Sequence, residues 1–397
     1  MSNQRIVIIG AGYAGAMTAI RLYGKTRSPH ITLVNAADHF VERIRLHQLA
    51  ANQKMRHFPL AKLLKGIQLV QGWVTGIAPD ASQISVKTAA GEQVIAYDYL
   101  VYALGSTVDT ETVPGVREYA LTVGDENRTL QLQAQLRDLA ARGGQVVIGG
   151  GGLTGIETAT EIAETYPTLH VSLITRDTLL HEFSSAARSY ALQVFAKLGI
   201  HLIEQQTITR VHPHALEMEN YTEIPFDLCI WAGAFRVAPL ARAAGITVNT
   251  GNQILVDEAL RSLSHPNIYA AGDAASLEAV WAMPTYMTCS TAMPMGAYVA
   301  DQLAAVIKGK PAPAPFRFGY VARCVSLGRR NAFLQLTRMD HSPREMVFTG
   351  WLGVQFKEMI CRGVVQVLHL ERHLPGAYSW LQPTPQKAIT SVVTELA

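Results

Sequence analysis

Two short glycine-rich segments have the residue types and the spacing that bind phosphate groups. The same pattern occurs at Gly10, Gly12 and Gly15 and again at Gly150, Gly152 and Gly155. In such a segment the first glycine permits a tight turn, the second lets the backbone approach a pyrophosphate, and the third lets a helix pack closely on a strand. The helix that follows offers free N–H groups to the phosphates. Each segment therefore predicts a dinucleotide site.

Both segments lie between an expected strand and an expected helix. Apolar runs typical of buried strands precede them, helical patterns follow, and a second apolar run closes each unit. The expected strands and helices are 5–10, 16–23 and 31–34 in the first unit and 145–149, 156–164 and 171–174 in the second. One such motif is weak evidence, but its repetition predicts two Rossmann-like units. The alternative is two glycine-rich turns in an unrelated α/β protein.

The residue that ends the second strand of a Rossmann unit usually contacts a ribose. Asn35 has this place in the first unit, and its amide can hydrogen-bond a hydroxyl. Thr175 and Arg176 have it in the second unit, where no carboxylate repels a 2′-phosphate and a guanidinium can hold one. This pattern favours NADPH over NADH at the second site. The alternative is an arginine on a solvated loop.

A third element carries a family resemblance. Residues 267–271 form a short apolar strand that ends in Gly272 and Asp273. This resembles the second FAD motif of the two-dinucleotide-domain flavoproteins, in which the aspartate meets the ribityl and pyrophosphate part of the flavin. The segment 98–105 resembles the strand and turn that close their FAD domain, although it reads Ala103-Leu104-Gly105 where the family has Ala-Thr-Gly.

Two further segments extend the resemblance. Residues 229–233, which end in Gly233, resemble the matching turn of the NAD domain, and Val74 lies where the family contacts the adenine through its backbone. The resemblance implies an α/β fold in which an NAD(P) domain is inserted into an FAD domain, followed by a C-terminal α+β interface domain. The expected limits are 1–114 and 253–312 for FAD, 115–252 for NAD(P) and 313–397 for the interface domain. The Pro- and Ala-rich run 310–315 predicts an extended linker.

The cysteines that follow the second strand distinguish the branches of this superfamily. The disulfide reductases have a CxxxxC pair there and related enzymes a single cysteine, but residues 40–48 contain none. Sulfide:quinone oxidoreductases also use cysteine pairs, and a meeting of Cys289 with Cys324 is the less favoured alternative. The segment 150–157, GGGLTGIE, is close to the second motif of the type II NADH dehydrogenases. In that family the residue matching Glu157 lies near nicotinamide and flavin, whereas on physical grounds alone it stabilises a helix N-terminus.

The C-terminal part resembles bacterial NADH-dehydrogenase-like subunits that contain FAD. The matching stretches are 326–331, 342–344 and 349–351, with Lys357 and Glu358. Two departures count against a respiratory quinone reductase. Residues 288–296 lack the Ala- and Gln-rich helix start that lines the quinone tunnel, and residues 370–397 contain three prolines and no basic amphipathic helix. Binding to a membrane surface stays open without support from this C-terminus.

Charged residues after the first unit are the candidates for the substrate side. Arg43 and Arg45 can bind an anionic acceptor or stabilise reduced flavin, and His47 can deliver a proton near neutral pH. The alternative is a charged helix in which Glu42 and Arg45 pair locally. The apolar stretch 281–295 predicts either an adaptable pocket over the flavin or ordinary core.

Composition excludes several classes of protein. With 49% hydrophobic and 16% charged residues the chain is a globular protein of two or three domains, not a disordered one. A net charge of +3 without a basic run argues against nucleic acid as a partner. The N-terminus lacks the pattern of a signal peptide and no apolar run approaches ~20 residues, so we expect a cytoplasmic protein. The four cysteines are too scattered for a metal site.

Three functions are compatible with these residues. The first is an FAD-dependent enzyme that passes a hydride from NADPH or NADH to flavin N5 and electrons to a quinone or another small acceptor. The second is a flavin enzyme that acts on a specialised metabolite, with the nucleotide site used only for reduction or degenerate. The third is a non-enzymatic redox sensor or electron carrier. The sequence indicates no oligomeric state.

Overall fold

The computed structural model describes residues 4–28, 30–278 and 286–383. Its first sheet has five parallel strands in the order β19-β7-β1-β2-β3. The strands are β1 (Ile6–Ile9), β2 (Ile31–Asn35), β3 (Gln68–Gln71), β7 (Tyr99–Tyr102) and β19 (Ile268–Ala270). All residues of β1 are buried because helices cover the sheet, and this explains the uninterrupted apolar run that predicts the strand.

The second sheet repeats this arrangement in the order β12-β11-β10-β16-β9 and is also parallel. Its strands are β9 (Ala120–Thr122), β10 (Gly144–Gly149), β11 (Leu169–Ile174), β12 (His201–Ile203) and β16 (Leu228–Trp231). Helix α1 (Tyr13–Thr26) connects β1 to β2, and α6 (Leu153–Thr165) connects β10 to β11. The two predicted strand–turn–helix–strand units, and with them the α/β fold of two Rossmann-like sheets, are confirmed.

Smaller sheets and helices surround these two. Antiparallel β4 (Trp73–Ala78), β5 (Gln83–Thr88) and β6 (Gly91–Ala96) attach to the first, and β13 (Ile208–Val211), β14 (Ala215–Met218) and β15 (Glu223–Pro225) to the second. Between the two sheets β8 (Thr107–Val108) pairs with β17 (Phe235–Arg236), where the chain leaves the first unit and returns to it. The predicted domain limits are compatible with this path and stay a prediction. The other short elements are α3 (Leu60–Leu63), α4 (Val116–Tyr119), α8 (Leu240–Ala243), β18 (Ile254–Leu255) and β20 (Ala275–Ser276).

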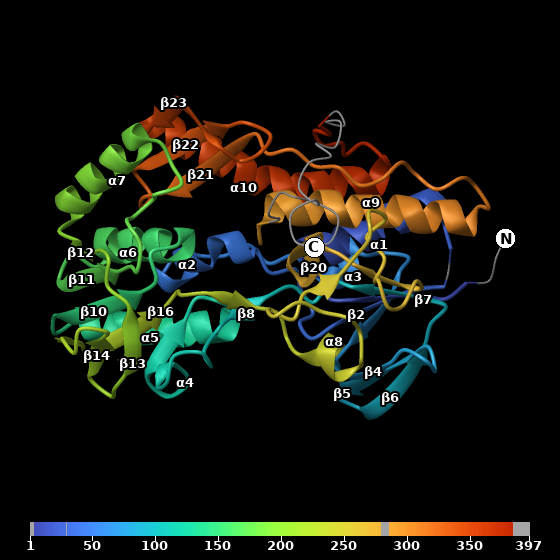
Figure 1. Cartoon of the computed structure of the whole chain (residues 1–397), viewed down its shortest axis with the longest axis horizontal. Coiled ribbons are helices and arrows are strands. Elements are labelled where there is room, and N and C mark those ends of the chain that lie inside the picture. The colour runs from blue at the N-terminus through green and yellow to red at the C-terminus, as the bar shows by residue number, and fades with distance from the viewer. Residues whose placement is uncertain (1–3, 29, 279–285, 384–397) are drawn as a thin grey trace, which may run out of the picture.

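The C-terminal part spans both units. Residues 310–321 contain no helix or strand, in keeping with the predicted linker. Strands β21 (Ala322–Ser326), β22 (Ala332–Thr337) and β23 (Pro343–Thr349) form an antiparallel sheet, and α10 (Gly350–His373) follows. Figure 1 shows this sheet near α6 and α7 (Ser185–Leu198), while α10 continues toward α1 and α9 (Cys289–Ile307). The C-terminal elements thus lie over the junction of the two units.

A buried ion-pair cluster fixes α10 to the first unit. Arg21 on α1 is 2.7 Å from Asp301 on α9 and 3.0 Å from Glu371 on α10. Glu371 also accepts hydrogen bonds from the backbone of Gly376 and Tyr378. All three helices are therefore held in one arrangement.

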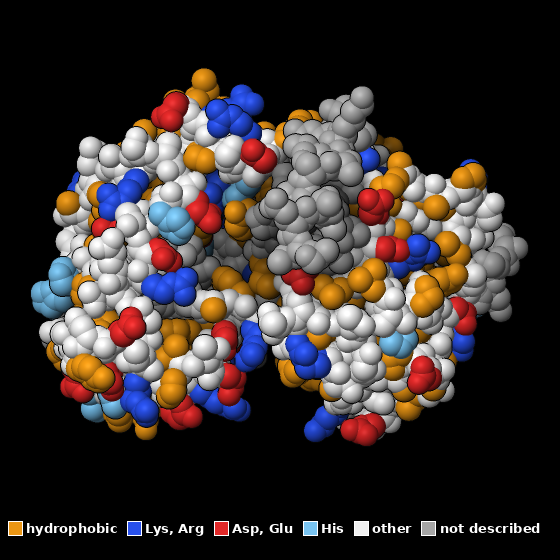
Figure 2. All heavy atoms as spheres, in the orientation of Figure 1, with side chains coloured by type: hydrophobic (Ala, Val, Ile, Leu, Met, Phe, Trp, Pro, Cys, Tyr) orange, Lys and Arg blue, Asp and Glu red, His pale blue; other side chains and the backbone are white. Residues whose placement is uncertain are grey.

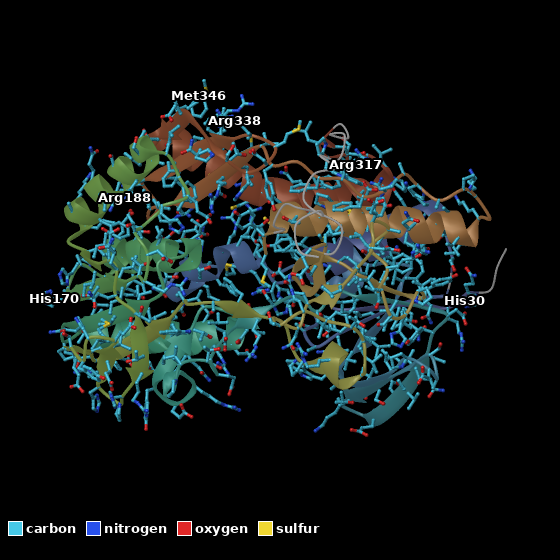
Figure 3. All side chains as sticks on the ribbon, in the orientation of Figure 1. His30, His170, Arg188, Arg317, Arg338 and Met346 are labelled. Carbon is cyan, nitrogen blue, oxygen red and sulfur yellow. The ribbon has the colours of Figure 1, made fainter. Side chains whose placement is uncertain are left out.

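Charged groups of both signs cover the visible surface. Figure 2 shows Lys and Arg side chains interspersed with Asp and Glu side chains over this face. In Figure 3, His30 and His170 lie at opposite ends of the molecule and Met346 and Arg338 at the outer edge of the C-terminal sheet.

No helix within the described residues combines the length and the apolar character needed to cross a membrane.

Candidate functional site

The first glycine turn has the geometry that a phosphate site requires. Gly10 has φ +98°, which favours glycine, and a side chain there would collide with the carbonyl of Ala103. A side chain at Gly15 would collide with the carbonyl of Gly10. A Cβ added to Gly12, in contrast, meets nothing within 4 Å. The turn is therefore closed on the protein side and open at its middle glycine.

The second turn repeats each of these features. Gly150 has φ +119° and lies against Ala232 and Gly233, at the end of β16. A Cβ at Gly155 would collide with the carbonyl of Gly150, and one at Gly152 meets nothing within 4 Å. The backbones of the two turns are thus equivalent, each pressed against the end of the neighbouring strand and open at the position where a pyrophosphate approaches.

The helices that follow the turns have uncapped N-termini. Gly12 and Gly152 are the N-cap residues of α1 and α6, and neither helix start has a side-chain cap. In contrast, Asp125, Ser184 and Thr288 accept hydrogen bonds at the starts of α5 (Glu126–Ala140), α7 and α9. The first N–H groups of α1 and α6 are therefore available to an anion, and both turns fit a dinucleotide phosphate.

Asn35 supports the first turn directly. Its Oδ1 accepts a hydrogen bond of 2.9 Å from the backbone N–H of Ala11, and its Nδ2 donates to the carbonyl of Ala37. Gly72 N–H donates to the carbonyl of Asn35, which brings the segment containing Val74 beside this strand end. Asn35 and Val74 therefore lie at one edge of the sheet, and their predicted contacts with ribose and adenine stay predictions.

Asp273 lies where three segments of the first unit meet. Its Oδ2 accepts a hydrogen bond of 2.7 Å from Ser106 and lies 3.8 Å from Arg43 NH1. Gly105, at φ +69°, lies next to the same guanidinium, and Gly272, at φ +72°, turns the chain before the aspartate. The structure thus brings together Arg43, Gly105 and Asp273. Sequence reasoning missed Ser106, whose signal was its place directly after the Ala-Leu-Gly turn.

Thr175 and Arg176, on which the predicted preference for NADPH rests, have different environments. The side chain of buried Thr175 packs on Gly151, so a Cβ at that glycine would collide with it. Arg176 is exposed, and its NH2 lies 3.4 Å from a carboxylate oxygen of Asp177. Asp177 was not considered in the sequence analysis, although it is the next residue, and its charge opposes the binding of a 2′-phosphate.

Glu157 forms a buried ion pair with Lys357 of α10. Lys357 Nζ donates to Glu157 Oε1 at 2.6 Å, and the N–H of Ser326 donates to the same oxygen. Burial opposes ionisation of Glu157, but Lys357 and His47 outweigh it and hold the pKa of this carboxyl below its usual value. Burial likewise opposes the charge of Lys357, and Glu157 outweighs it and raises the pKa of the amine. A fixed cation therefore lies between α6, β21 and α10.

His47 is buried on α2 (Leu46–Ala50), which follows a 3-10 turn at η1 (Arg43–Arg45). Its Nδ1 lies 3.6 Å from Glu157 Oε2, and its Nε2 lies 3.9 Å from Glu161 Oε1. Burial lowers the pKa of His47 to about 4. At this pKa the imidazole is neutral near pH 7, and the predicted role of His47 in proton delivery stays a prediction; the ring lies within a cluster of ionisable groups.

Arg45 is held by α10. Its guanidinium forms two hydrogen bonds, of 3.0 and 2.9 Å, with Glu358, and its Nε lies 3.4 Å from Glu42. Burial disfavours the Glu358 carboxylate, but Arg45 and Arg362 outweigh this and lower its pKa to about 2. The local pairing of Glu42 with Arg45 is present, and Arg45 also stabilises the contact between the first unit and α10.

The charge of Lys357 acts on three thiols, those of Cys289, Cys324 and Cys361. Burial raises the pKa of Cys324 to about 12 and that of Cys289 to about 11, and Lys357 opposes the shift at both thiols. Asp273 also raises the pKa of Cys289. All four cysteines are free. Within the described parts of the chain, no three His, Cys, Asp or Glu side chains group as metal ligands.

The apolar stretch 281–295 is only partly described. Trp281 and Met283 lie outside the described residues. Met293 and Met295 are buried in the core of the first unit on α9, whereas Tyr286 and Met287 are partly buried at its edge. The core interpretation therefore holds for these two methionines of α9.

Comparison with known proteins agrees with this fold. The model of the pyridine nucleotide-disulphide oxidoreductase family matches residues 4–296. An NADH dehydrogenase-like protein of Mycobacterium tuberculosis is 26% identical, covering 74% of this chain and 78% of its own. A demethylphylloquinone reductase of Synechocystis is 27% identical, covering 84% and 87%. Sulfide:quinone oxidoreductase of Aquifex aeolicus has a similar structure, with a TM-score of 0.79, 22% identity and coverage of 94% and 93%.

The architecture is that of the two-domain FAD/NAD flavoproteins. The chain belongs to the pyridine nucleotide-disulphide oxidoreductase family and, within it, to the type II NADH dehydrogenase-like branch. The chain is therefore an enzyme, an NAD(P)H-dependent flavin oxidoreductase.

Proposed function

We propose that the chain binds FAD at the first glycine turn and NAD(P)H at the second, and reduces a quinone or another small acceptor. The observation that carries this proposal is the pair of equivalent turns, each open at its middle glycine and followed by an uncapped helix. The position of Asp273 beside the first turn supports FAD at that site, because the flavin motif of the family ends in this aspartate.

The chain's own residues supply binding and charge. When bound, the flavin accepts a hydride from nicotinamide and passes the electrons on to the acceptor. Asp273, oriented by Ser106 and Arg43, is placed to hold the ribityl part of the cofactor. The N-termini of α1 and α6 hold the two pyrophosphates, and α10 covers the junction of the two units.

Lys357 is the residue suited to the acceptor step. It is a partly buried cation whose charge Glu157 maintains, and it lies on α10, which covers the junction of the two units. A cation there stabilises negative charge that develops on reduction and can give a proton to the product. Reduction of a two-electron acceptor by NAD(P)H consumes one proton from solvent, so Glu157 has the role of returning a proton to Lys357.

A quinone is the acceptor that the relatives favour. The Synechocystis relative is a demethylphylloquinone reductase, and the structurally similar Aquifex protein is a quinone oxidoreductase. The segment 288–296 departs from the quinone-tunnel pattern, so the proposal extends to other small two-electron acceptors. We expect the purified protein to contain FAD and to oxidise NADH or NADPH with a soluble short-chain quinone. A protein without flavin, or one that oxidises neither nucleotide, would overturn this function.

The second site is proposed to prefer NADPH. Arg176 is exposed at the end of β11 and free to turn toward a 2′-phosphate, with Asp177 as the competing charge. We expect Arg176→Ala to lower the NADPH/NADH ratio of kcat/KM by roughly tenfold, equivalent to ~1.4 kcal/mol. Asp177→Asn should raise the same ratio and serves as the opposite control. An unchanged ratio in Arg176→Ala would sink the preference.

A further inference from the structure

Two buried polar atoms without a hydrogen-bond partner face each other in the structure. They are Nε2 of His47 on α2 and Oε1 of Glu161 on α6, and they lie 3.9 Å apart. His47 is 3% exposed and Glu161 is 0% exposed. Buried polar atoms are nearly always hydrogen-bonded, so a facing pair of this kind needs a physical explanation.

The tautomer of His47 explains why its Nε2 has no hydrogen to donate to Glu161. Glu157 lies 3.6 Å from the other ring nitrogen, Nδ1, and is kept ionised by Lys357. A carboxylate at that position favours the N–H on Nδ1 and leaves Nε2 as an acceptor. An ionised Glu161 would place lone pairs against this acceptor, whereas a protonated Glu161 can donate to it. One proton on Glu161 therefore makes the two atoms complementary, and a hydrogen bond between them forms when the 3.9 Å gap closes.

The surrounding charges favour the same arrangement. Burial is the largest influence and raises the pKa of Glu161 to about 7. Glu164 and Glu157 act in the same direction, and Arg329 and Gln53 act against it. At His47 burial and the cations Lys357, Arg329 and Arg45 disfavour the charged ring, and Glu157 favours it. Of the two groups, Glu161 therefore holds the proton more tightly than His47, and it is protonated below a pH of about 7.

Glu161 is also close to solvent through its neighbours. Its Oε2 accepts a hydrogen bond of 2.7 Å from Gln53, and its Oε1 lies 3.7 Å from Arg329, whose side chain is 40% exposed. Gln53 and Arg329 line a surface pocket of about 180 Å³ together with Arg45 and Glu358. Four ionisable groups thus follow one another from the residues behind this pocket toward α10: Glu161, His47, Glu157 and Lys357.

We propose that Glu161 and His47 relay protons from this pocket to the Glu157–Lys357 ion pair while the acceptor is reduced. This role rests on the proposed function. The O–H bond of Glu161 breaks as an N–H bond forms at Nε2, and the N–H bond at Nδ1 breaks as an O–H bond forms on Glu157. Glu157 then replaces the proton that Lys357 has given to the reduced acceptor, and no relay residue is oxidised or reduced. Each gap must shorten by about 1 Å to hydrogen-bond length. Glu161 then regains one proton from solvent through the pocket, and the ring returns from the Nε2–H to the Nδ1–H tautomer by proton exchange with water.

The test separates the two half-reactions of the holoenzyme by rapid mixing. Glu161→Gln keeps the shape of the side chain and its contact with Gln53 but cannot carry the proton. Glu164→Gln, on the same helix and outside the relay, is the matched control. We expect Glu161→Gln to leave flavin reduction by NADH or NADPH unchanged, and to slow reoxidation by a short-chain quinone by roughly tenfold or more. The pH dependence of reoxidation near neutrality should disappear in this variant and persist in the control, shifted to lower pH because the charge of Glu164 raises the pKa of Glu161.

A second readout does not depend on activity. The wild-type holoenzyme should show the infrared carbonyl stretch of a protonated carboxyl group below neutral pH. This band should be absent in Glu161→Gln and retained in Glu164→Gln. Its absence from the wild type, or reoxidation by the variant at the wild-type rate and pH profile, would overturn the relay. If Glu161→Gln does not fold, His47→Asn carries the same kinetic test.

Failure of the relay differs from failure of the proposed function. A wild-type protein that reduces neither flavin nor quinone contradicts the function, whatever the infrared band shows. A protein that completes both half-reactions, with Glu161→Gln indistinguishable from wild type, contradicts only the relay.

Discussion

A methyl group added at Gly15 or at Gly155 should impair one dinucleotide site and leave the other intact. A Cβ at Gly15 or at Gly155 collides with the carbonyl of the first glycine of its own turn, so the turn must distort. We expect Gly15→Ala to lose most of its flavin, measured by the visible absorbance of the purified protein. Gly155→Ala should retain flavin but bind nucleotide roughly tenfold more weakly, a loss of ~1.4 kcal/mol.

Gly363→Ala on α10 is the control for this pair, because a Cβ there meets nothing within 4 Å. It should keep both flavin and nucleotide affinity. Loss of flavin in Gly155→Ala with retention in Gly15→Ala would mean that the two turns have been assigned the wrong way round.

His47 and Glu161 should affect stability with opposite dependence on pH. The pKa of Glu161 is raised from 4.5 to about 7, so its stabilisation is complete below pH 4.5 and is lost as the pH rises to about 7. The pKa of His47 is lowered from 6.5 to about 4, so its stabilisation is present above pH 6.5 and is lost as the pH falls to about 4. The two slopes oppose each other in the wild type.

When either side chain is removed, the pH dependence of the unfolding free energy that is due to the other should become measurable. Glu161→Gln is expected to become less stable on acidification below pH 6.5 than wild type, and His47→Asn to become less stable as the pH rises above 4.5. For one proton the slope is at most ~1.4 kcal/mol per pH unit. Urea unfolding midpoints at several pH values measure it. Parallel curves for wild type and both variants would show that neither group is perturbed.

At the scale of elements, local patterns predicted the units that carry the phosphate sites. The strand, the glycine turn and the start of the helix are determined by residues close in sequence, such as the buried run of β1 and the positive φ of Gly10. The antiparallel sheet β4–β6 and the helix α2 were not predicted. Strand pairing depends on residues far apart in the chain, and α2 is only five residues long, too short to show a helical period.

The packing of α10 depends on Glu371, which joins it to α1. Loss of this carboxylate leaves buried Arg21 with Asp301 and the carbonyl of Tyr378, and it leaves two backbone N–H groups without their acceptor. We expect Glu371→Ala to lose about 3–5 kcal/mol of unfolding free energy. Arg117→Ala removes the exposed ion pair with Glu111 and should cost less than about 1 kcal/mol. Thermal unfolding of both variants tests this, and equal losses would contradict the role of the buried cluster.

At the scale of the whole molecule, the site depends on pairs that the sequence does not reveal. Glu157 and Lys357 are 200 residues apart, and Arg45 and Glu358 are 313 residues apart. Each residue was singled out from the sequence, but nothing local identifies which acid meets which base. These partners are decided only when α10 packs over the junction of the two units.

The central claim is that one chain holds a flavin and a nicotinamide nucleotide and transfers electrons from the second to the first. Anaerobic mixing of the purified protein with NADH and with NADPH, followed by the visible flavin spectrum, tests it most directly. We predict bleaching of the flavin within seconds by at least one nucleotide and much slower bleaching in Gly155→Ala. A bound flavin that neither nucleotide reduces would contradict the account.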